Sequence, residues 1–175
     1  MIFRKATEAD LDAVEAGYTE LLTHEREHGA WTAWKLGVYP TRATARTALE
    51  AGELYVLELE DGSLPVSVIL GRTQPEEYAS IPWQIPADGD RALVVHTLCV
   101  RPSASGRGLG KETVRQILAE ARRQGCAAVR LDTGSQNKPA VGLYTGQGFT
   151  LAGTGSVQLG GQIPHAGQVF LEHAV

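Results

Sequence analysis

Three glycines stand at alternate positions in VVHTLCVRPSASGRGLGKETV, a stretch that runs from an apolar segment into one with helical periodicity. They are Gly106, Gly108 and Gly110. Glycine adopts positive φ and lets the backbone approach a ligand closely, at an entropic cost on ordering. A loop between a strand end and a helix start presents unpaired N–H groups and a dipole that favour an anion. The stretch is therefore interpreted as a phosphate cradle, and a flexible glycine-rich connector is the alternative.

Two familiar nucleotide motifs do not fit this loop. A Walker loop requires G-x-x-x-x-G-K-[ST], but Glu112 follows the glycine and lysine, and Ser105 stands at the first glycine position. A dinucleotide fingerprint requires G-x-G-x-x-G directly after a strand, whereas the spacing here is G-x-G-x-G. Asp132 lies near the distance expected for a ribose-binding acid, which is a weak match. A dinucleotide-binding oxidoreductase is therefore the least favoured function.

A second block with chemical potential is NKPAVGLYTGQGF, residues 137–149. Asn137 is suited to cap a short helix, and Pro139 falls in its first turn, where proline is tolerated. Tyr144 follows Asn137 by seven residues, and its ring could cover the core while its hydroxyl meets water.

Taken together, the two blocks resemble the GCN5-related N-acetyltransferases (GNAT family). VRPSASGRGLG is similar to the family's acetyl-coenzyme A loop, [QR]-x-x-G-x-[GA], and residues 137–149 match N-x-x-A-x-x-L-Y-x-x-x-G-F. The N-terminal FRKATEADLDAV also resembles the family's first strand and helix, so the resemblance covers most of the chain and is closest over 92–149. Three positions depart from the pattern: Ser105 replaces [QR], Gln147 replaces an apolar residue, and Gly142 lies inside the short helix.

The resemblance implies how acetyl-coenzyme A would bind. Its pyrophosphate would lie on the N–H groups of residues 106–111, with added positive charge from Arg107 and Lys111, unless these two are only solvated. Its pantetheine arm would lie between strands 92–100 and 126–132, which splay apart and leave backbone groups unpaired. The amide of Leu98 would face the thioester oxygen. The Tyr144 hydroxyl would reach the departing sulfur and act as the general acid. The expected coenzyme-binding residues are Leu98, Cys99, Val100, Ser105, Gly106, Arg107, Gly108, Leu109, Gly110, Lys111, Asn137 and Ala140.

His96 is the candidate base that would take a proton from an acceptor amine. It lies two residues before Leu98 in the same expected strand, and side chains two apart share a face. The family often places a glutamate there, and a histidine changes charge near neutral pH. A structural strand histidine is the alternative. A nucleophilic pair of His96 and Cys99 would need a bulge, because residues three apart face opposite sides of a regular strand.

The reaction expected from the resemblance is transfer of an acetyl group to a primary amine of a small molecule, by direct attack in a ternary complex. Acetylation of a protein N-terminus or lysine is the alternative within the class, and a non-catalytic acyl-coenzyme A sensor is the alternative outside it. Aromatic residues in loops often line small-molecule sites, and as often close a core. The candidates for the acceptor pocket are Trp31, Trp34, Tyr39, Tyr78 and Trp83.

Hydrophobic periodicity predicts the elements that must position these residues. Helices are expected over 8–24, 41–52, 110–125 and from 137, and strands over 2–6, 91–100, 126–133, 149–159 and 168–175. Asp61-Gly62 predicts a hairpin within 53–72. Residues 72–90 hold three prolines and are interpreted as a long excursion between strands. The expected fold is α/β, with a mixed, mostly antiparallel sheet, a parallel splayed βαβ core and helices on both faces.

Length, composition and charge limit the remaining possibilities. The 175 residues, 43% of them hydrophobic, suit one domain over 1–175. A net charge of −4 argues against a protein that coats nucleic acid or an anionic membrane. The two cysteines, Cys99 and Cys126, form no CxxC motif, so reduced buried thiols and no metal are expected. With neither a signal peptide nor a membrane span evident, a cytoplasmic location is expected, and a homodimer is possible.

Overall fold

The computed structural model describes all 175 residues. It contains a seven-stranded sheet in the order β1-β2-β3-β4-β5-β7-β6. All neighbouring strands are antiparallel except the parallel pair β4 and β5. This confirms the predicted mixed, mostly antiparallel sheet. The strands are β1 (Ile2–Lys5), β2 (Leu54–Glu58), β3 (Val66–Gly71), β4 (Ala92–Val100), β5 (Ala128–Gly134), β6 (Thr150–Leu159) and β7 (Ile163–Ala174).

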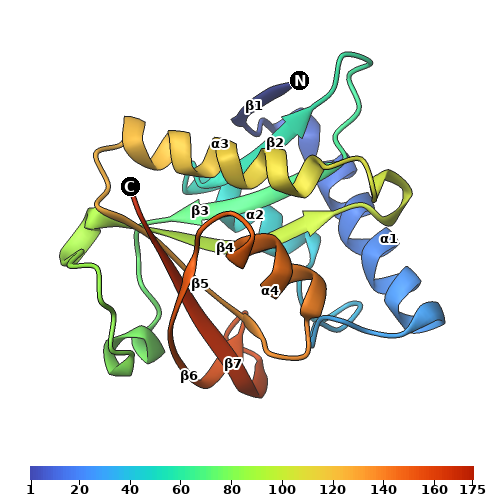
Figure 1. Ribbon diagram of the computed structural model, residues 1–175. Coiled ribbons are helices and arrows are strands. Elements are labelled where there is room, and N and C mark those ends of the chain that lie inside the picture. Colours follow the sequence, from blue (N-terminus) through green and yellow to red (C-terminus); the bar gives the residue numbers. More distant parts are fainter.

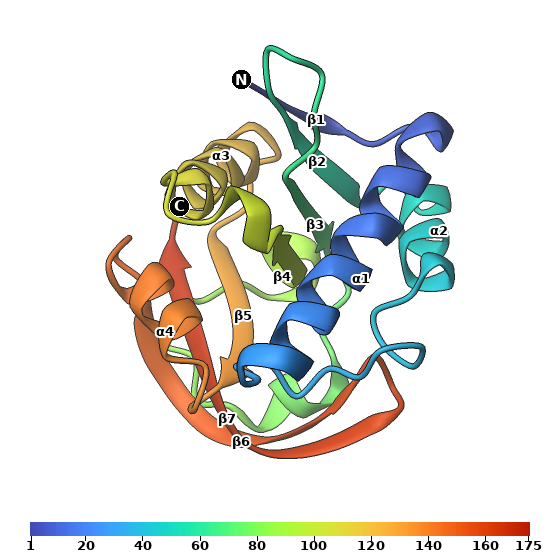
Figure 2. The ribbon, with the colours of Figure 1, turned by 90° about the vertical axis from the view of Figure 1, so that its right-hand side faces the viewer.

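Helices cover both faces of the sheet, as predicted (Figure 1). Helices α1 (Leu11–His28) and α2 (Arg42–Glu50) lie on one side, and α3 (Leu109–Arg123) and α4 (Lys138–Thr145) lie on the other (Figure 2). Helices α1 and α3 bury the apolar stripes that their sequence spacing predicts, except that Leu21 of α1 is only partly buried. The stripe of α1 is Leu11, Val14, Tyr18 and Leu22, and that of α3 is Val114, Ile117, Leu118 and Ala121.

The first helix is longer than its apolar spacing predicts. A 3₁₀ turn, η1 (Glu8–Asp10), precedes α1, and α1 continues to His28 rather than ending near residue 24. The extra turn forms because Glu25 continues the buried stripe and its carboxylate bonds to the segment that follows the helix. The end of α1 is therefore fixed by a polar contact that a hydrophobic pattern does not reveal.

The proline-rich excursion over 72–90 is packed rather than loose. It contains two 3₁₀ turns, η2 (Glu76–Ser80) and η3 (Gly89–Arg91). Tyr78 and Ile81 are buried against Phe170 of β7. The segment has no periodicity because only a few anchors enter the core.

The last two strands form a longer hairpin than predicted. β7 begins at Ile163, not at residue 168, because Gly160 and Gly161 make a turn with positive φ at both positions. The ladder therefore includes His165, which lies opposite Val157 of β6. The Gly- and Pro-containing sequence between the turn and residue 168 concealed this extension.

Candidate functional site

Strands β4 and β5 separate part-way along their length. Their parallel ladder ends at the pair Val94–Arg130, yet β4 continues to Val100 and β5 to Gly134. Beyond Val94, the edge of β4 that faces β5 has no strand partner. Unpaired backbone groups on such an edge are available to a ligand. This is the splay that the sequence resemblance predicts.

A bulge in β4 changes which side chains face this opening. Between the partner pairs Ser67–Cys99 and Ile69–His96, one residue of β3 lies opposite two residues of β4. Thr97, inside the bulge, has a φ of 48°, which is unusual for a residue other than glycine. A bulge adds one residue to one strand and so reverses the alternation of side chains beyond it.

The prediction that His96 shares a face with Leu98 is therefore wrong. Leu98 packs with Val95 in the core under α3 and α4, whereas Cys99 packs with the core under α1 and α2. His96 lies on the Cys99 side, is partly buried and does not line the cavity described below. Burial lowers its pKa, and the negative charge of Asp132 opposes that shift.

The same bulge brings His96 and Cys99 to one face, but they do not form a nucleophilic pair. No hydrogen bond joins them. Burial raises the pKa of the Cys99 thiol to about 12, so the thiol is protonated at neutral pH. Both cysteines are free and buried, as predicted.

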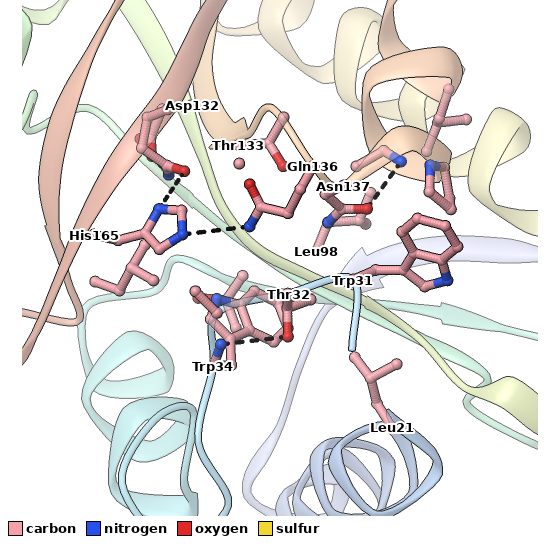
Figure 3. Close-up of a pocket in the computed structure, with 18 of the residues that line it drawn as sticks. Leu21, Trp31, Thr32, Trp34, Leu98, Asp132, Thr133, Gln136, Asn137 and His165 are labelled. Atoms are coloured by element: carbon pink, nitrogen blue, oxygen red, sulfur yellow. Dashed lines mark hydrogen bonds between the residues drawn. The ribbon is translucent and has the colours of Figure 1, made fainter. Parts of the chain in front are cut away.

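A cavity of about 280 Å³ occupies the opening between β4 and β5. One end is bordered by β4, β5 and α4, including Leu98, Asn137 and Tyr144. The other end is bordered by the β6–β7 hairpin, with His165, and by Trp34 of the segment after α1, whereas Trp31 of that segment lies beside Leu98 and Asn137 (Figure 3). Segments that are far apart in sequence therefore meet around one cavity.

Tyr144 lies in the wall of this cavity. Its side chain is 5% exposed, and its ring meets Phe149 edge-on with centroids 5.4 Å apart. Its hydroxyl makes no hydrogen bond within the chain. Burial raises the pKa of Tyr144, and the nearby charge of Asp132 raises it further. The hydroxyl is therefore protonated at neutral pH and can donate a proton to a group in the cavity.

The glycine loop has the geometry of an anion cradle. Gly106 and Gly108 have φ of 75° and 74°, and a Cβ at either position would meet no atom within 4 Å. None of the N–H groups of residues 106–111 donates to a backbone oxygen. Gly108 is the N-cap of α3, so these donors surround a helix N-terminus. Free donors and open space fit the pyrophosphate of acetyl-coenzyme A.

Other residues of the loop differ in what they contribute. Arg107 and Lys111 are exposed. The Ser105 hydroxyl donates to the Pro102 carbonyl at 2.7 Å, so it is used within its own turn. Gly110 serves packing, because a Cβ there would lie 3.3 Å from a methyl group of Leu143 in α4.

Asn137 makes a local contact, whereas Arg101 makes a contact with a distant helix. Asn137 caps α4, as predicted, by accepting from the Ala140 N–H at 3.2 Å. Both residues also border the cavity. Arg101 lies outside the loop, because its guanidinium reaches across to α1 and donates to the Ala13 carbonyl at 2.5 Å.

The tryptophan segment is held in place by a buried carboxylate. Glu25 of α1 accepts from the Trp31 N–H at 3.1 Å and from the Thr32 N–H at 3.0 Å. Its second oxygen accepts from the Thr32 hydroxyl at 2.6 Å. Trp31, which is 49% exposed, and Trp34 both border the cavity.

The other three aromatic candidates do not line the cavity. The Tyr39 hydroxyl bonds to the Thr97 hydroxyl at 2.5 Å, and its ring meets Trp34 edge-on. Tyr78 is buried, and the Trp83 indole N–H donates to its carbonyl at 2.9 Å. The guanidinium of Arg130 lies over the Trp83 ring. Tyr39 contacts two residues that line the cavity, Thr97 and Trp34, and Tyr78 and Trp83 belong to the core.

Sequence reasoning missed several polar residues that border the cavity. Glu25 carried a signal, since it stands on the apolar stripe of α1. Asp132 also carried one, since Asp132 and Arg130 are the two charged residues of strand β5. Gln168 and His165 carried no signal in the sequence, because nothing in the local pattern showed which side chains of β7 face the cavity.

Comparison with known proteins agrees with the fold and with the geometry of the site. A sequence model of the Acetyltransferase (GNAT) family matches residues 15–149. The chain belongs to this GNAT acetyltransferase family. Solved GNAT structures share its fold: one from Streptococcus agalactiae covers 99% of this chain and 95% of its own, with 19% identity and a TM-score of 0.80. A Salmonella typhimurium protein, yncA, solved with acetyl-coenzyme A, covers 99% and 93%, with 22% identity and a TM-score of 0.70.

Named relatives with higher identity match only part of the chain. An L-methionine sulfoximine/L-methionine sulfone acetyltransferase of Pseudomonas aeruginosa is 32% identical over 93 residues, which is 53% of this chain and 49% of that protein. The N-alpha-acetyltransferase RimI of Mycobacterium tuberculosis is 34% identical over 84 residues, 48% and 42% of the two chains. This chain thus spans half or less of the length of these relatives. In addition, no helix of this GNAT chain has the length and apolar character to cross a membrane.

Proposed function

We propose that this GNAT protein transfers an acetyl group from acetyl-coenzyme A to a primary amine of a small molecule, by direct attack in a ternary complex. The observation that carries the proposal is the single cavity. It joins the splayed strands, Tyr144 and Trp31 at one end to Trp34 and the β6–β7 hairpin at the other. Both substrates can therefore meet within one cavity, where proximity lowers the barrier to reaction.

The residues present divide the work. The bound thioester supplies an activated acetyl group. The free N–H groups of residues 106–111 hold the pyrophosphate, with added charge from Arg107 and Lys111. The unpaired edge of β4 at Leu98–Val100, together with Asn137, holds the pantetheine arm. Tyr144 donates a proton to the departing sulfur.

A small acceptor is favoured over a protein chain. Trp34 and the β6–β7 hairpin border the acceptor end, and Glu25 holds the segment that carries Trp31 and Thr32. The cavity volume of about 280 Å³ suits a small molecule. The relatives include enzymes named for both acceptor types, methionine sulfoximine and a protein N-terminus. The buried, protonated hydroxyl of Tyr144 favours an enzyme over a coenzyme-binding sensor.

The test is release of free thiol from acetyl-coenzyme A with a panel of small amines and, separately, with peptides that have free N-termini or lysines. Turnover with a small amine at a rate above that with every peptide is expected. Turnover with peptides alone would assign a protein acceptor. Binding of acetyl-coenzyme A with no turnover on either panel would assign a sensor, and no binding would refute the proposal.

Other features belong to this proposal as well. The chain would act as one domain over residues 1–175, in the cytoplasm, with no nucleic acid, membrane or metal partner and with a homodimer as one possible state. Gel filtration with light scattering measures the oligomeric state directly.

A further inference from the structure

A row of hydrogen bonds runs along the acceptor end of the cavity. The Asp132 carboxylate accepts from the Tyr78 hydroxyl at 2.8 Å with one oxygen, and from the Gln168 amide nitrogen at 2.7 Å with the other. The Gln168 amide oxygen lies 3.0 Å from Nδ1 of His165. Nε2 of His165 lies 3.3 Å from the Gln136 side-chain nitrogen. Figure 3 shows Asp132, His165 and Gln136 along the same wall.

Hydrogen-bond polarity fixes the direction of this row. An ionised carboxylate only accepts, so Gln168 must present its NH₂ group to Asp132. Its amide oxygen therefore faces His165, and an amide oxygen only accepts. Nδ1 of His165 must then carry the hydrogen. Gln168 is 2% exposed, so it has no water with which to exchange these partners.

The consequence is a defined tautomer of His165. With its hydrogen on Nδ1, the neutral ring keeps a lone pair on Nε2. This lone pair accepts from the exposed Gln136 amide N–H at 3.3 Å, a long bond that an acceptor ammonium would replace. His165 itself borders the cavity, together with Leu98 and Tyr144. We propose that His165 is the base that takes a proton from the acceptor amine, and that Asp132 and Gln168 are positioning residues that hold its Nε2 lone pair toward the cavity. This rests on the acetyl transfer proposed above.

The proton balance of this step closes within the site. Nε2 of His165 takes one proton from the acceptor ammonium, and the freed nitrogen lone pair forms the C–N bond as the C–S bond breaks. The Tyr144 hydroxyl gives its proton to the sulfur and regains one from the same nitrogen. His165 releases its proton to solvent, so one proton is produced per turnover.

Few charged groups oppose or assist His165. The titratable side chains that share the cavity with it are Glu25 from α1, Asp132 from β5 and Tyr144 from α4, and no lysine or arginine is among the lining residues. Glu77 of η2 approaches β6 beside it, where it accepts from the Gln158 N–H at 3.1 Å. Asp132 is the carboxylate that the hydrogen-bond row connects to His165.

The first test reads the tautomer without any reaction. In protein labelled with ¹⁵N-histidine, long-range ¹H–¹⁵N spectra at high pH distinguish a hydrogen on Nδ1 from one on Nε2, and His165→Gln identifies the signal. We expect the Nδ1–H form in the wild type and a mixture of forms in Gln168→Met, which keeps the volume but removes both bonds. An Nε2–H form in the wild type would overturn the proposal.

The second test reads the pH dependence of kcat/KM with the best amine. His165→Gln is expected to lower it by about 10²–10⁴-fold and to remove the limb between pH 5 and 8, where histidine titrates. Gln168→Met should lower kcat with little change in acetyl-coenzyme A affinity, and His24→Gln on exposed α1 is the control. Turnover with an unchanged acid limb in His165→Gln would refute the base role, whereas absence of turnover in the wild type would instead refute the proposed function.

Discussion

Tyr144 shows how burial prepares a single side chain for acid chemistry. Its hydroxyl has no partner within the chain, and its raised pKa keeps the proton in place at neutral pH. We expect Tyr144→Phe to lower kcat by about 10²–10⁴-fold, the usual range for a lost general acid. Acetyl-coenzyme A affinity should change little, because the phenylalanine ring keeps the contact with Phe149.

Steady-state kinetics and a coenzyme titration on the same preparation check this. Equal kcat values in the variant and the wild type would show that the sulfur departs without help from Tyr144.

His96 illustrates a group that affects stability rather than catalysis. Its pKa is lowered in the folded state, so the unfolded chain binds more protons as the pH falls through about 6.5. The contribution of His96 to the free energy of unfolding therefore becomes less favourable as the pH falls, and it recovers as the pH rises. We expect His96→Gln to reduce the difference in free energy of unfolding between pH 7.5 and pH 5.

Urea titrations at both pH values measure that difference. The variant should also keep the acid limb of the kinetic profile, because His96 lies outside the cavity. Loss of that limb would restore His96 as the base and argue against His165.

At the scale of elements, the glycine loop and the start of α3 form the proposed anion site. Gly108 has positive φ and open space around a Cβ, so a carboxylate there would enter the cradle without a steric clash. We expect Gly108→Asp to abolish the stabilisation by acetyl-coenzyme A, which for the wild type is about 2.7 kcal/mol at 100 times the dissociation constant. Thermal unfolding with and without the coenzyme measures the effect.

Gly62 offers a matched control in the β2–β3 turn. It has φ of 78° and no atom within 4 Å of a Cβ, so Gly62→Asp introduces the same strain and charge elsewhere. Gly62→Asp should retain the full coenzyme effect. Loss of the effect in both variants would mean that strain, not the position of the carboxylate, is responsible.

At the scale of the whole molecule, the cavity's charge predicts its acceptors. Glu25 and Asp132 contribute carboxylates to the lining, and no lysine or arginine lies among the lining residues. An acceptor with its own carboxylate would therefore meet like charge. We expect an amine to exceed its α-carboxylated counterpart, such as tyramine against tyrosine, by at least about tenfold in kcat/KM, or about 1.4 kcal/mol.

The comparison should be made at one pH with both acceptors far below KM. Equal or greater turnover of the amino acid would indicate that a cation from outside this chain, such as a second copy, completes the site.

The sequence by itself determined the family, the order of the elements and the coenzyme loop. These features are local: the amphipathic spacing of α3, the glycines at 106–110 and the cap at Asn137 each act through near neighbours in the chain. The capped helices and the splayed parallel pair follow from such local signals together with the resemblance. The prediction of Tyr144 as the acid comes from the resemblance, through its seven-residue spacing from Asn137.

The tertiary structure decided which face of β4 carries His96 and which residues border the acceptor end of the cavity. One extra residue in β4 turned His96 away from the cavity, and no local pattern reveals the pairing that creates this bulge. His165 joined the site because a tight glycine turn extends β7 along β6, and its tautomer depends on Gln168 and Asp132 from two strands. These properties arise from contacts between distant segments, so they exist only once the chain has folded.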